Sequence, residues 1–307
     1  MHAAEYSFSE IGAKLGRSKG TICREIQRNC VAHRGDYYAI GAQYRSEARR
    51  GNAKVSQRKK ILVPRIRRYV LRKLKLEWSP EQIAGRMKWD YPNDAEMRIS
   101  HTSIYKWLKA DKRGGGRWYR FLRQARHRRR RYGQKTKRYL VEGKVSIEKR
   151  PKVVDRRQRK GDWEGDLMQG KDRKSYLLTY TERKTGLLLL SKIRNKSAKV
   201  VLDATIALFR NIPVRNRKTI TYDNGTEFSR FRDIESATGM KCYFAHPYSS
   251  WERGTNENTN GLIRQYVPKS KDIRRTRRSL LAKAKRRLNN RPRKRLGYRT
   301  PNEVMNA

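Results

Sequence analysis

Three acidic residues stand in positions where their carboxylates could act together. Asp166 lies late in one predicted strand, Asp223 ends another, and Glu257 lies on a predicted helix. Carboxylates brought close to one another repel unless a metal ion neutralises them. Hard oxygen ligands favour Mg(II), or else Mn(II), and two such ions about 3.5–4 Å apart promote phosphoryl transfer. The pattern therefore predicts a site that holds two divalent cations and acts on phosphate esters.

Each acid also has a plainer interpretation, which the residues alone leave open. The sequence Asp223-Asn224-Gly225 fits a tight turn. Glu257 fits a charge on the surface of a helix, where most charged side chains lie. Glu164 shares the strand face of Asp166 and could take its place, because side chains two positions apart in a strand point the same way.

The predicted helix around Glu257 favours the metal interpretation. Offsets of four, three and four positions place one set of side chains on a single helical face: Arg253, Glu257, Asn260 and Arg264. A carboxylate flanked by cations and amides suits a metal site beside phosphates. We expect Arg253 and Arg264 to contact DNA phosphates. We expect Asn224 and Asn260 to support the metal ligands from behind.

The elements that must position these residues follow from the pattern of the second half of the chain. Short apolar segments predict strands, and amphipathic segments predict helices between them. The predicted strands cover residues 161–168, 175–180, 187–193, 218–222 and 242–244, and the predicted helices cover 197–210, 227–238 and 251–267. The order βββαβαβα predicts an α/β fold with a mixed sheet and helices on its faces.

The first residues of the chain predict two short helices joined by a turn. Ser7 can cap the first helix, Glu10 three positions later completes a capping box, and Gly16 ends the helix. Ser18 can cap the second helix. This pattern is typical of a helix-turn-helix that places its second helix in the major groove of DNA, although an ordinary helical hairpin is the alternative. We expect DNA contacts from the polar face of the second helix: Lys19, Thr21, Arg24 and Arg28.

The chain is expected to divide into four segments. Residues 1–32 form the first helix-turn-helix, and residues 57–110 form a second, helix-turn-helix-like helical domain that also contacts DNA. Residues 111–152 form a basic linker. The catalytic core with its C-terminal helix occupies residues 153–307.

The charge of the chain points to a polyanionic partner. Its 307 residues include 78 Lys and Arg against 28 Asp and Glu, a formal net charge of +50. Such a charge repels itself unless a polyanion neutralises it, so we expect contact with nucleic acid. A structural protein of the ribosomal type and a protein bound to a membrane surface are the alternatives.

The sequence argues against several other classes of protein. No apolar run approaches the roughly 20 residues that span a bilayer, and the first residues lack a secretory signal. The three cysteines form no CxxC pair and the five histidines show no HxxxH spacing, which argues against zinc or histidine-ligated metal. We therefore expect an intracellular chain with reduced cysteines.

Five stretches carry a resemblance to a known family. They are IGAKLGRSKGTICREIQRN (11–29), GDWEGDL (161–167), TYDNGTEF (221–228), FAHPYSSWERGTNENTNGLIRQYVPK (244–269) and LNNRPRKRLGYRTPNEV (288–304). Together they closely resemble the insertion-sequence-thirty family of bacterial transposases. The resemblance covers nearly the whole chain.

This resemblance implies a ribonuclease-H-like core of the retroviral-integrase superfamily, preceded by helical helix-turn-helix units. It implies that Asp166, Asp223 and Glu257 form an Asp-Asp-Glu triad, both catalytic and metal-binding. The implied activity is binding of double-stranded DNA at the inverted terminal repeats of an element, followed by cleavage and transfer of a strand to target DNA. We expect a homo-oligomer that works in the bacterial cytoplasm, at the nucleoid. Family members carry a further helix before residue 11, so we expect the first unit to be shorter here.

Two other functions remain open from the sequence. A nuclease or junction resolvase with the ribonuclease-H fold would cut DNA without joining it. A catalytically inactive regulator would use the helix-turn-helix units to bind DNA and nothing more.

Overall fold

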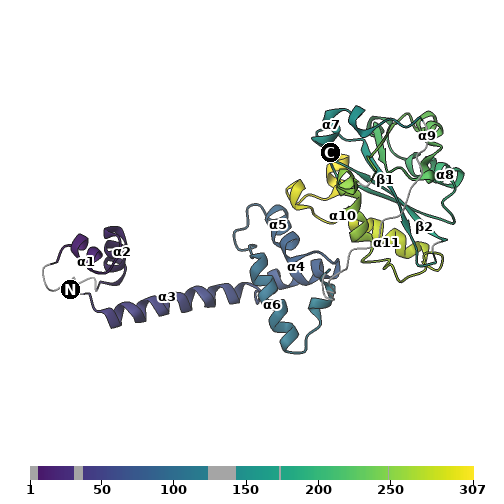
Figure 1. Cartoon of the computed structure of the whole chain (residues 1–307). Helices are drawn as coiled ribbons and strands as arrows, with labels where there is room; N and C mark the ends of the chain where they lie inside the picture. The colour runs from purple at the N-terminus through teal and green to yellow at the C-terminus, as the bar shows by residue number, and fades with distance from the viewer. Residues whose placement is uncertain (1–5, 31–36, 124–142, 173, 248) are drawn as a thin grey trace.

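A mixed five-stranded sheet forms the centre of the second half of the chain in the computed structural model (Figure 1). The structure describes residues 6–30, 37–123, 143–172, 174–247 and 249–307, without the side chains of residues 53–59 and 250. The strands are β1 (Asp162–Gln169), β2 (Tyr176–Glu182), β3 (Leu188–Ile193), β4 (Thr219–Tyr222) and β5 (Lys241–Phe244). Their order is β3-β2-β1-β4-β5, with β1 antiparallel to β2 and parallel to β4. The predicted mixed sheet is confirmed.

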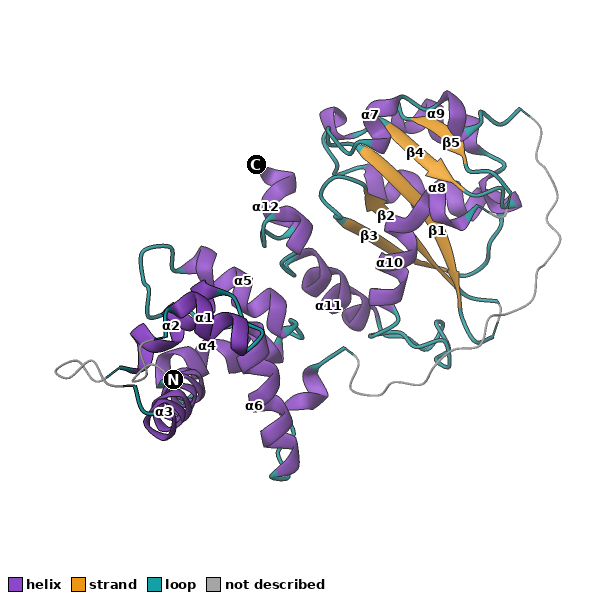
Figure 2. Cartoon of the chain, turned by 60° about the vertical axis from the view of Figure 1, so that its left-hand side comes forward, coloured by secondary structure: helices purple, strands orange, loops and turns teal. Residues whose placement is uncertain are grey.

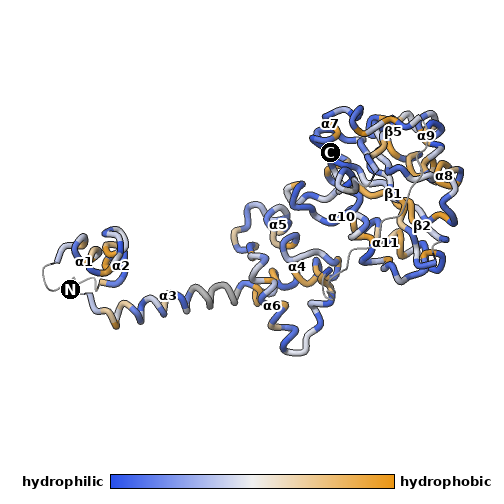
Figure 3. Tube along the Cα trace, viewed as in Figure 1, coloured by the Kyte–Doolittle hydropathy of each residue, from blue (hydrophilic) through white to orange (hydrophobic). Residues whose placement is uncertain are grey.

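Helices cover both faces of this sheet because successive strand residues point to opposite sides. Leu178 and Tyr180 face a core shared with α8 (Ala198–Phe209) and α9 (Phe231–Thr238). Leu177 faces a second core, shared with α10 (Gly254–Ile263) and α11 (Arg278–Asn289). Figure 2 shows the strands between these helices, and Figure 3 shows apolar residues gathered along β1, β2 and α8. The result is a three-layer α/β/α core of the ribonuclease-H type.

The first helical unit forms as its capping residues predict. In α1 (Phe8–Lys14), Ser7 and Glu10 make the capping box. In α2 (Lys19–Asn29), the Ser18 side chain accepts a hydrogen bond from the backbone of Thr21 at 3.3 Å. Gly16, between the helices, has φ +61°, a conformation that costs glycine little.

A long helix, α3 (Ala39–Lys60), follows this unit, and no pattern in the sequence predicted it. Its first residues, Ala39 and Ile40, are exposed, so it presents little of the apolar stripe by which an amphipathic helix is recognised. Contacts near its start come instead from arginines. Arg49 donates to Asn29 Oδ1 at 2.7 Å, and Arg45 donates to the carbonyl of Asn29.

A second helical unit consists of α4 (Pro64–Lys75), α5 (Pro80–Asp90) and α6 (His101–Arg113). Ser79 and Gln82 form a capping box at the start of α5. The unit has its own apolar core, to which Val70, Leu74 and Ile83 contribute. A short 3₁₀ turn, Trp118–Phe121, packs against that core.

Two predicted helices are shorter than expected. Residues 227–238 were expected to be one helix, but a 3₁₀ turn (Thr226–Phe228) precedes α9. Residues 251–267 were also expected to be one helix, but a 3₁₀ turn (Ser250–Arg253) precedes α10, which ends at Ile263. Pro268 disfavours a helical backbone at the residue before it, and the chain closes there in turns.

Both ends of the predicted basic linker are folded. Residue 113 still belongs to α6, and the carbonyl of Val145 accepts a hydrogen bond from Phe244 of β5 at 2.9 Å. A short helix, α7 (Lys152–Asp155), precedes β1, and α12 (Pro301–Asn306) lies near the C-terminus. The middle of the linker, residues 124–142, lies outside the described residues.

Candidate active site

Asp166 and Asp223 lie at the same edge of the sheet because β1 and β4 are parallel neighbours. Glu164 of β1 is paired with Thr221 of β4. Asp166 lies two residues beyond the first member of this pair, and Asp223 lies two residues beyond the second. The carboxyl ends of parallel strands are where α/β proteins commonly place ligands.

The guanidinium of Arg253 joins the two carboxylates. Its Nη1 lies 3.2 Å from Asp166 Oδ1, and its Nη2 lies 3.2 Å from Asp223 Oδ2. The Arg253 side chain is only 13% exposed. Burial opposes the charge, but Asp166 and Asp223 outweigh it, and the pKa of Arg253 is raised. Two carboxylates from different strands thus converge on one cationic group.

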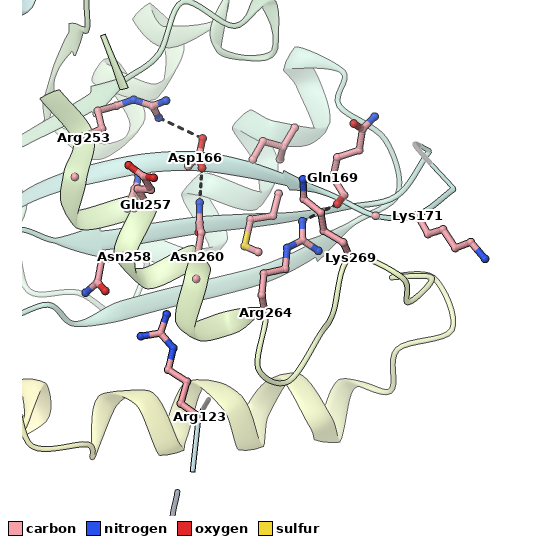
Figure 4. Close-up of a pocket in the computed structure, with 16 residues that line it drawn as sticks. Arg123, Asp166, Gln169, Lys171, Arg253, Glu257, Asn258, Asn260, Arg264 and Lys269 are labelled. Atoms are coloured by element: carbon pink, nitrogen blue, oxygen red, sulfur yellow. Dashed lines mark hydrogen bonds and ion pairs between the residues drawn. The ribbon is translucent and has the colours of Figure 1, made fainter. Parts of the chain in front are cut away.

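A pocket of about 1020 Å³ opens beside Asp166, and α10 forms one wall of it. The four side chains expected on one helical face all line this pocket: Arg253, Glu257, Asn260 and Arg264. Glu257 is exposed, and Figure 4 shows it on the side of α10 that faces the strand bearing Asp166. The part of the chain that the structure describes contains no group of three His, Cys, Asp or Glu side chains arranged to hold a metal. The third acid therefore borders the site without closing a three-carboxylate cluster.

Glu164 plays a different part from Asp166, although both lie on β1. Its side chain is fully buried and forms an ion pair with Arg183. It also accepts a hydrogen bond from the backbone nitrogen of Asn256 at 2.8 Å. Glu164 therefore ties β1 to the first turn of α10, whereas Asp166 faces the pocket.

The two asparagines expected to support the ligands are held differently. Asn260 donates a hydrogen bond from Nδ2 to Asp166 Oδ2, and its Oδ1 accepts one from Thr179 at 3.4 Å. Asn224 donates instead to the carbonyl of Ala245 at 2.7 Å, which links the end of β4 to the chain after β5. Asn260 contacts a candidate ligand directly, and Asn224 fixes the loop that carries Asp223.

The two arginines expected at DNA phosphates also differ. Arg253 is bound to the carboxylates. Arg264 lies further along the pocket and donates to the carbonyl of Gln169 at 2.9 Å.

The donor set of this edge fits a divalent cation. Asp166 and Asp223 offer oxygen atoms to the same cationic group, and oxygen ligands are those that Mg(II) and Mn(II) prefer. Glu257, on the adjoining pocket wall, adds a third carboxylate to the same surroundings. Asp166, Asp223 and Glu257 are the residues of this site that could hold such a cation.

Three cations line the pocket that the sequence pattern did not predict there: Arg123, Lys171 and Lys269. Arg123 lies in the very basic stretch 111–160, where 21 Lys and Arg offer no signal that singles one out. Lys171 and Lys269 follow β1 and the turn after α10. Only the fold brings these three side chains to the same place.

The four helix-turn-helix residues form an exposed polar face. Lys19, Thr21, Arg24 and Arg28 are all exposed on α2. Ile22, between them in sequence, is buried against the rest of the unit. This arrangement leaves the predicted DNA-contact face available.

Two protein families match separate parts of this chain. The integrase core domain family matches residues 156–250, and a helix-turn-helix domain family matches residues 1–29. The catalytic core domain of BIV integrase is 20% identical and has a TM-score of 0.37, with coverage of 47% of this chain and 93% of that chain.

Curated relatives extend the similarity over almost the whole chain. The transposase for insertion sequence element IS4351 of Bacteroides fragilis is 41% identical over 95% of this chain and 88% of its own length. The transposase InsI for IS30A of Escherichia coli is 36% identical over 99% of this chain and 79% of its own. The transposase for IS1086 of Cupriavidus metallidurans is 36% identical over 99% of this chain and 90% of its own length.

None of the helices in the described part of the chain combines the length and the apolar character that a membrane span requires.

Proposed function

The chain belongs to the IS30 family of transposases, and we propose that Asp166, Asp223 and Glu257 are the carboxylates of its active site. Its function is DNA transposition and recombination, carried out by a helix-turn-helix and a polynucleotidyl transferase core of the integrase type. The observation that carries the assignment is the convergence of Asp166 and Asp223 on Arg253, beside a pocket that Glu257 lines.

The three carboxylates hold two divalent cations, Mg(II) or Mn(II), in this proposal. When bound, the cations supply activation of the attacking oxygen and neutralise charge on the leaving oxygen of a phosphodiester. Asn260 keeps the carboxylate of Asp166 oriented through its hydrogen bond. Arg253 and Arg264, both on the pocket wall, hold phosphates of the DNA strand beside the acids.

The remaining parts of the chain bring DNA to this site. Lys19, Thr21, Arg24 and Arg28 contact the inverted terminal repeats of the element through the first helix-turn-helix. The core then cuts a strand and transfers its 3′-hydroxyl to target DNA. Because two ends must be joined, the active complex is a homo-oligomer. It acts on DNA in the bacterial cytoplasm, at the nucleoid.

Removal of divalent metal tests this proposal. The full chain is incubated with a duplex that carries the inverted repeat flanking its own reading frame, in Mg(II) or in excess EDTA. We expect strand cleavage in Mg(II) and none in EDTA, because the acids need cations to act on a phosphodiester. Cleavage that continued unchanged in EDTA would contradict the assignment, and a duplex of scrambled sequence serves as the control for specificity.

A further inference from the structure

An interface built from ion pairs joins the second helical unit to the C-terminal part of the catalytic core. Arg86 of α5 binds Glu303 of α12 through two hydrogen bonds of 2.7 Å, which lower the pKa of Glu303 to about 2. Glu77, after α4, binds Arg287 of α11 at 2.6 Å. Charged hydrogen bonds fix orientation as well as contributing energy, and the bidentate pair of Arg86 with Glu303 does so most. We call this surface, with Gly85 and Tyr298, the latch.

The backbone of the latch is strained at two points, one in each of the parts that it joins. Glu77 has φ +64° and Tyr298 has φ +63°, values that residues with side chains rarely adopt. The carbonyl of Tyr298 accepts a hydrogen bond from Arg86, and the Tyr298 ring lies over Gly85. A Cβ added at Gly85 would lie 2.3 Å from the ring. Strain of this kind persists where surrounding contacts impose it, and it gathers at functional places.

A second attachment connects the same helical unit to the active-site pocket. The turn Trp118–Phe121 packs on the apolar core of the unit. Arg123, two residues later, lines the pocket, and its Nη2 lies 3.2 Å from where a Cβ of Gly261 would be. The unit thus reaches the core both through the latch and at the site of chemistry.

Helix α6 presents a basic surface that DNA can reach. Figures 1 and 2 show α5 beside the C-terminal segment and α6 on the other side of the unit. Several cations are exposed along α6: Lys106, Lys109, Lys112 and Arg113. The latch therefore leaves this basic surface uncovered.

We propose that the latch holds α6 at a fixed position relative to the active site, so that DNA bound on α6 presents one particular phosphodiester to the pocket. The latch residues are positioning residues, and they set where the strand is cut. The inference rests on the proposed function, since it assumes DNA cleavage at Asp166 and Asp223. It goes beyond that function because the second unit then determines which phosphodiester is cut, in addition to binding DNA.

Two substitutions in the latch test the inference in the full chain, one that adds a side chain at Gly85 and one that removes the ring of Tyr298. Gly85→Leu places a side chain where the Tyr298 ring lies, and leucine favours helix, so α5 itself is not weakened. Tyr298→Gly removes the ring and suits a positive φ. We expect G85L to lose cleavage at the wild-type bond by about 100-fold, because ångström-scale misplacement costs that much, and to cut at neighbouring bonds. The double variant G85L/Y298G regains the wild-type bond.

A distance measurement separates this inference from the proposed function. Spin labels at Lys109→Cys on α6 and Lys199→Cys on α8, with Cys23 and Cys30 replaced by serine, report the separation of the two units without DNA. We expect one narrow distance distribution in the wild-type background, a broad one in G85L and a narrow one in G85L/Y298G. A narrow distribution in G85L, or an unchanged cutting position there, would overturn the latch. Narrow distances in a wild-type chain that does not cut DNA would overturn the proposed function alone.

Discussion

Asp223→Asn abolishes DNA strand cleavage while DNA binding stays within about 2-fold of wild type. The amide removes a negative charge from the edge where β4 ends and takes away an oxygen ligand for a divalent cation. It keeps the size of the side chain and the acceptor oxygen that Gly225 N contacts at 3.1 Å. We expect cleavage to fall at least about 10³-fold, which corresponds to about 4 kcal/mol in the barrier.

A matched variant shows whether charge alone explains the loss. Asp233→Asn makes the same chemical change on α9, where Asp233 pairs with Arg230 at the surface. We expect this variant to cleave like the wild type. End-labelled duplex and a gel-shift assay measure cleavage and binding on the same samples. Cleavage by D223N at the wild-type rate would refute the assignment of Asp223.

Arg183→Met destabilises the catalytic core by about 3–5 kcal/mol, the usual cost of leaving a buried charge without its partner. Glu164 is fully buried, and the Arg183 side chain is 8% exposed. Removing the guanidinium leaves the Glu164 carboxylate charged in the interior. Of the two partners described above, it then keeps the backbone nitrogen of Asn256. Urea unfolding followed by circular dichroism measures the change as a lower midpoint.

The double variant Arg183→Met, Glu164→Gln separates the cost of the unpaired charge from the cost of lost packing around Arg183. Neutralising Glu164 removes the unpaired charge, so we expect the double variant to recover part of the lost stability. Arg156→Met, a change at an exposed arginine nearby in sequence, serves as the control and leaves the midpoint unchanged. If R183M were as stable as R156M, Glu164 would not be the structural acid described here.

The choice between Glu164 and Asp166 shows what the sequence could and could not decide. Strand alternation places both acids on the same face of β1. Residue type and spacing therefore do not tell which of the two is the candidate metal ligand. The distinction depends on Arg183, which lies in the connection after β2, where no local pattern relates it to Glu164. Its ion pair with Glu164 leaves Asp166 facing the pocket.

Helices and strands were predicted well where residues close together in the sequence mark them. The Ser7 capping box begins a helix as expected, and the short apolar segments form the five strands. Helix α3 lacks an apolar stripe, so periodicity did not reveal it. Long-range contacts were also invisible, because nothing local relates Arg123 to Gly261 or Gly85 to Tyr298.

Arg253 was expected at a phosphate, which stays a prediction, and in this structure its guanidinium lies between the carboxylates of Asp166 and Asp223. The side chains expected to gather on one face do so, since Arg253, Glu257 and Asn260 all line one pocket, although Arg253 precedes the helix itself. The 3₁₀ turn before α10 places the guanidinium within reach of both strand ends. Helical spacing predicts a face, whereas the partner of a side chain depends on how that face meets the sheet.

A strand-transfer assay tests the central claim most directly. The full chain receives an end-labelled duplex already cut to expose the 3′-hydroxyl of the element's terminal repeat, a supercoiled target plasmid and Mg(II). We expect labelled DNA to become joined to the plasmid by the wild-type chain and not by D223N. Cleavage of DNA without any joined product, in Mg(II) and in Mn(II), would identify a hydrolytic nuclease and contradict the account.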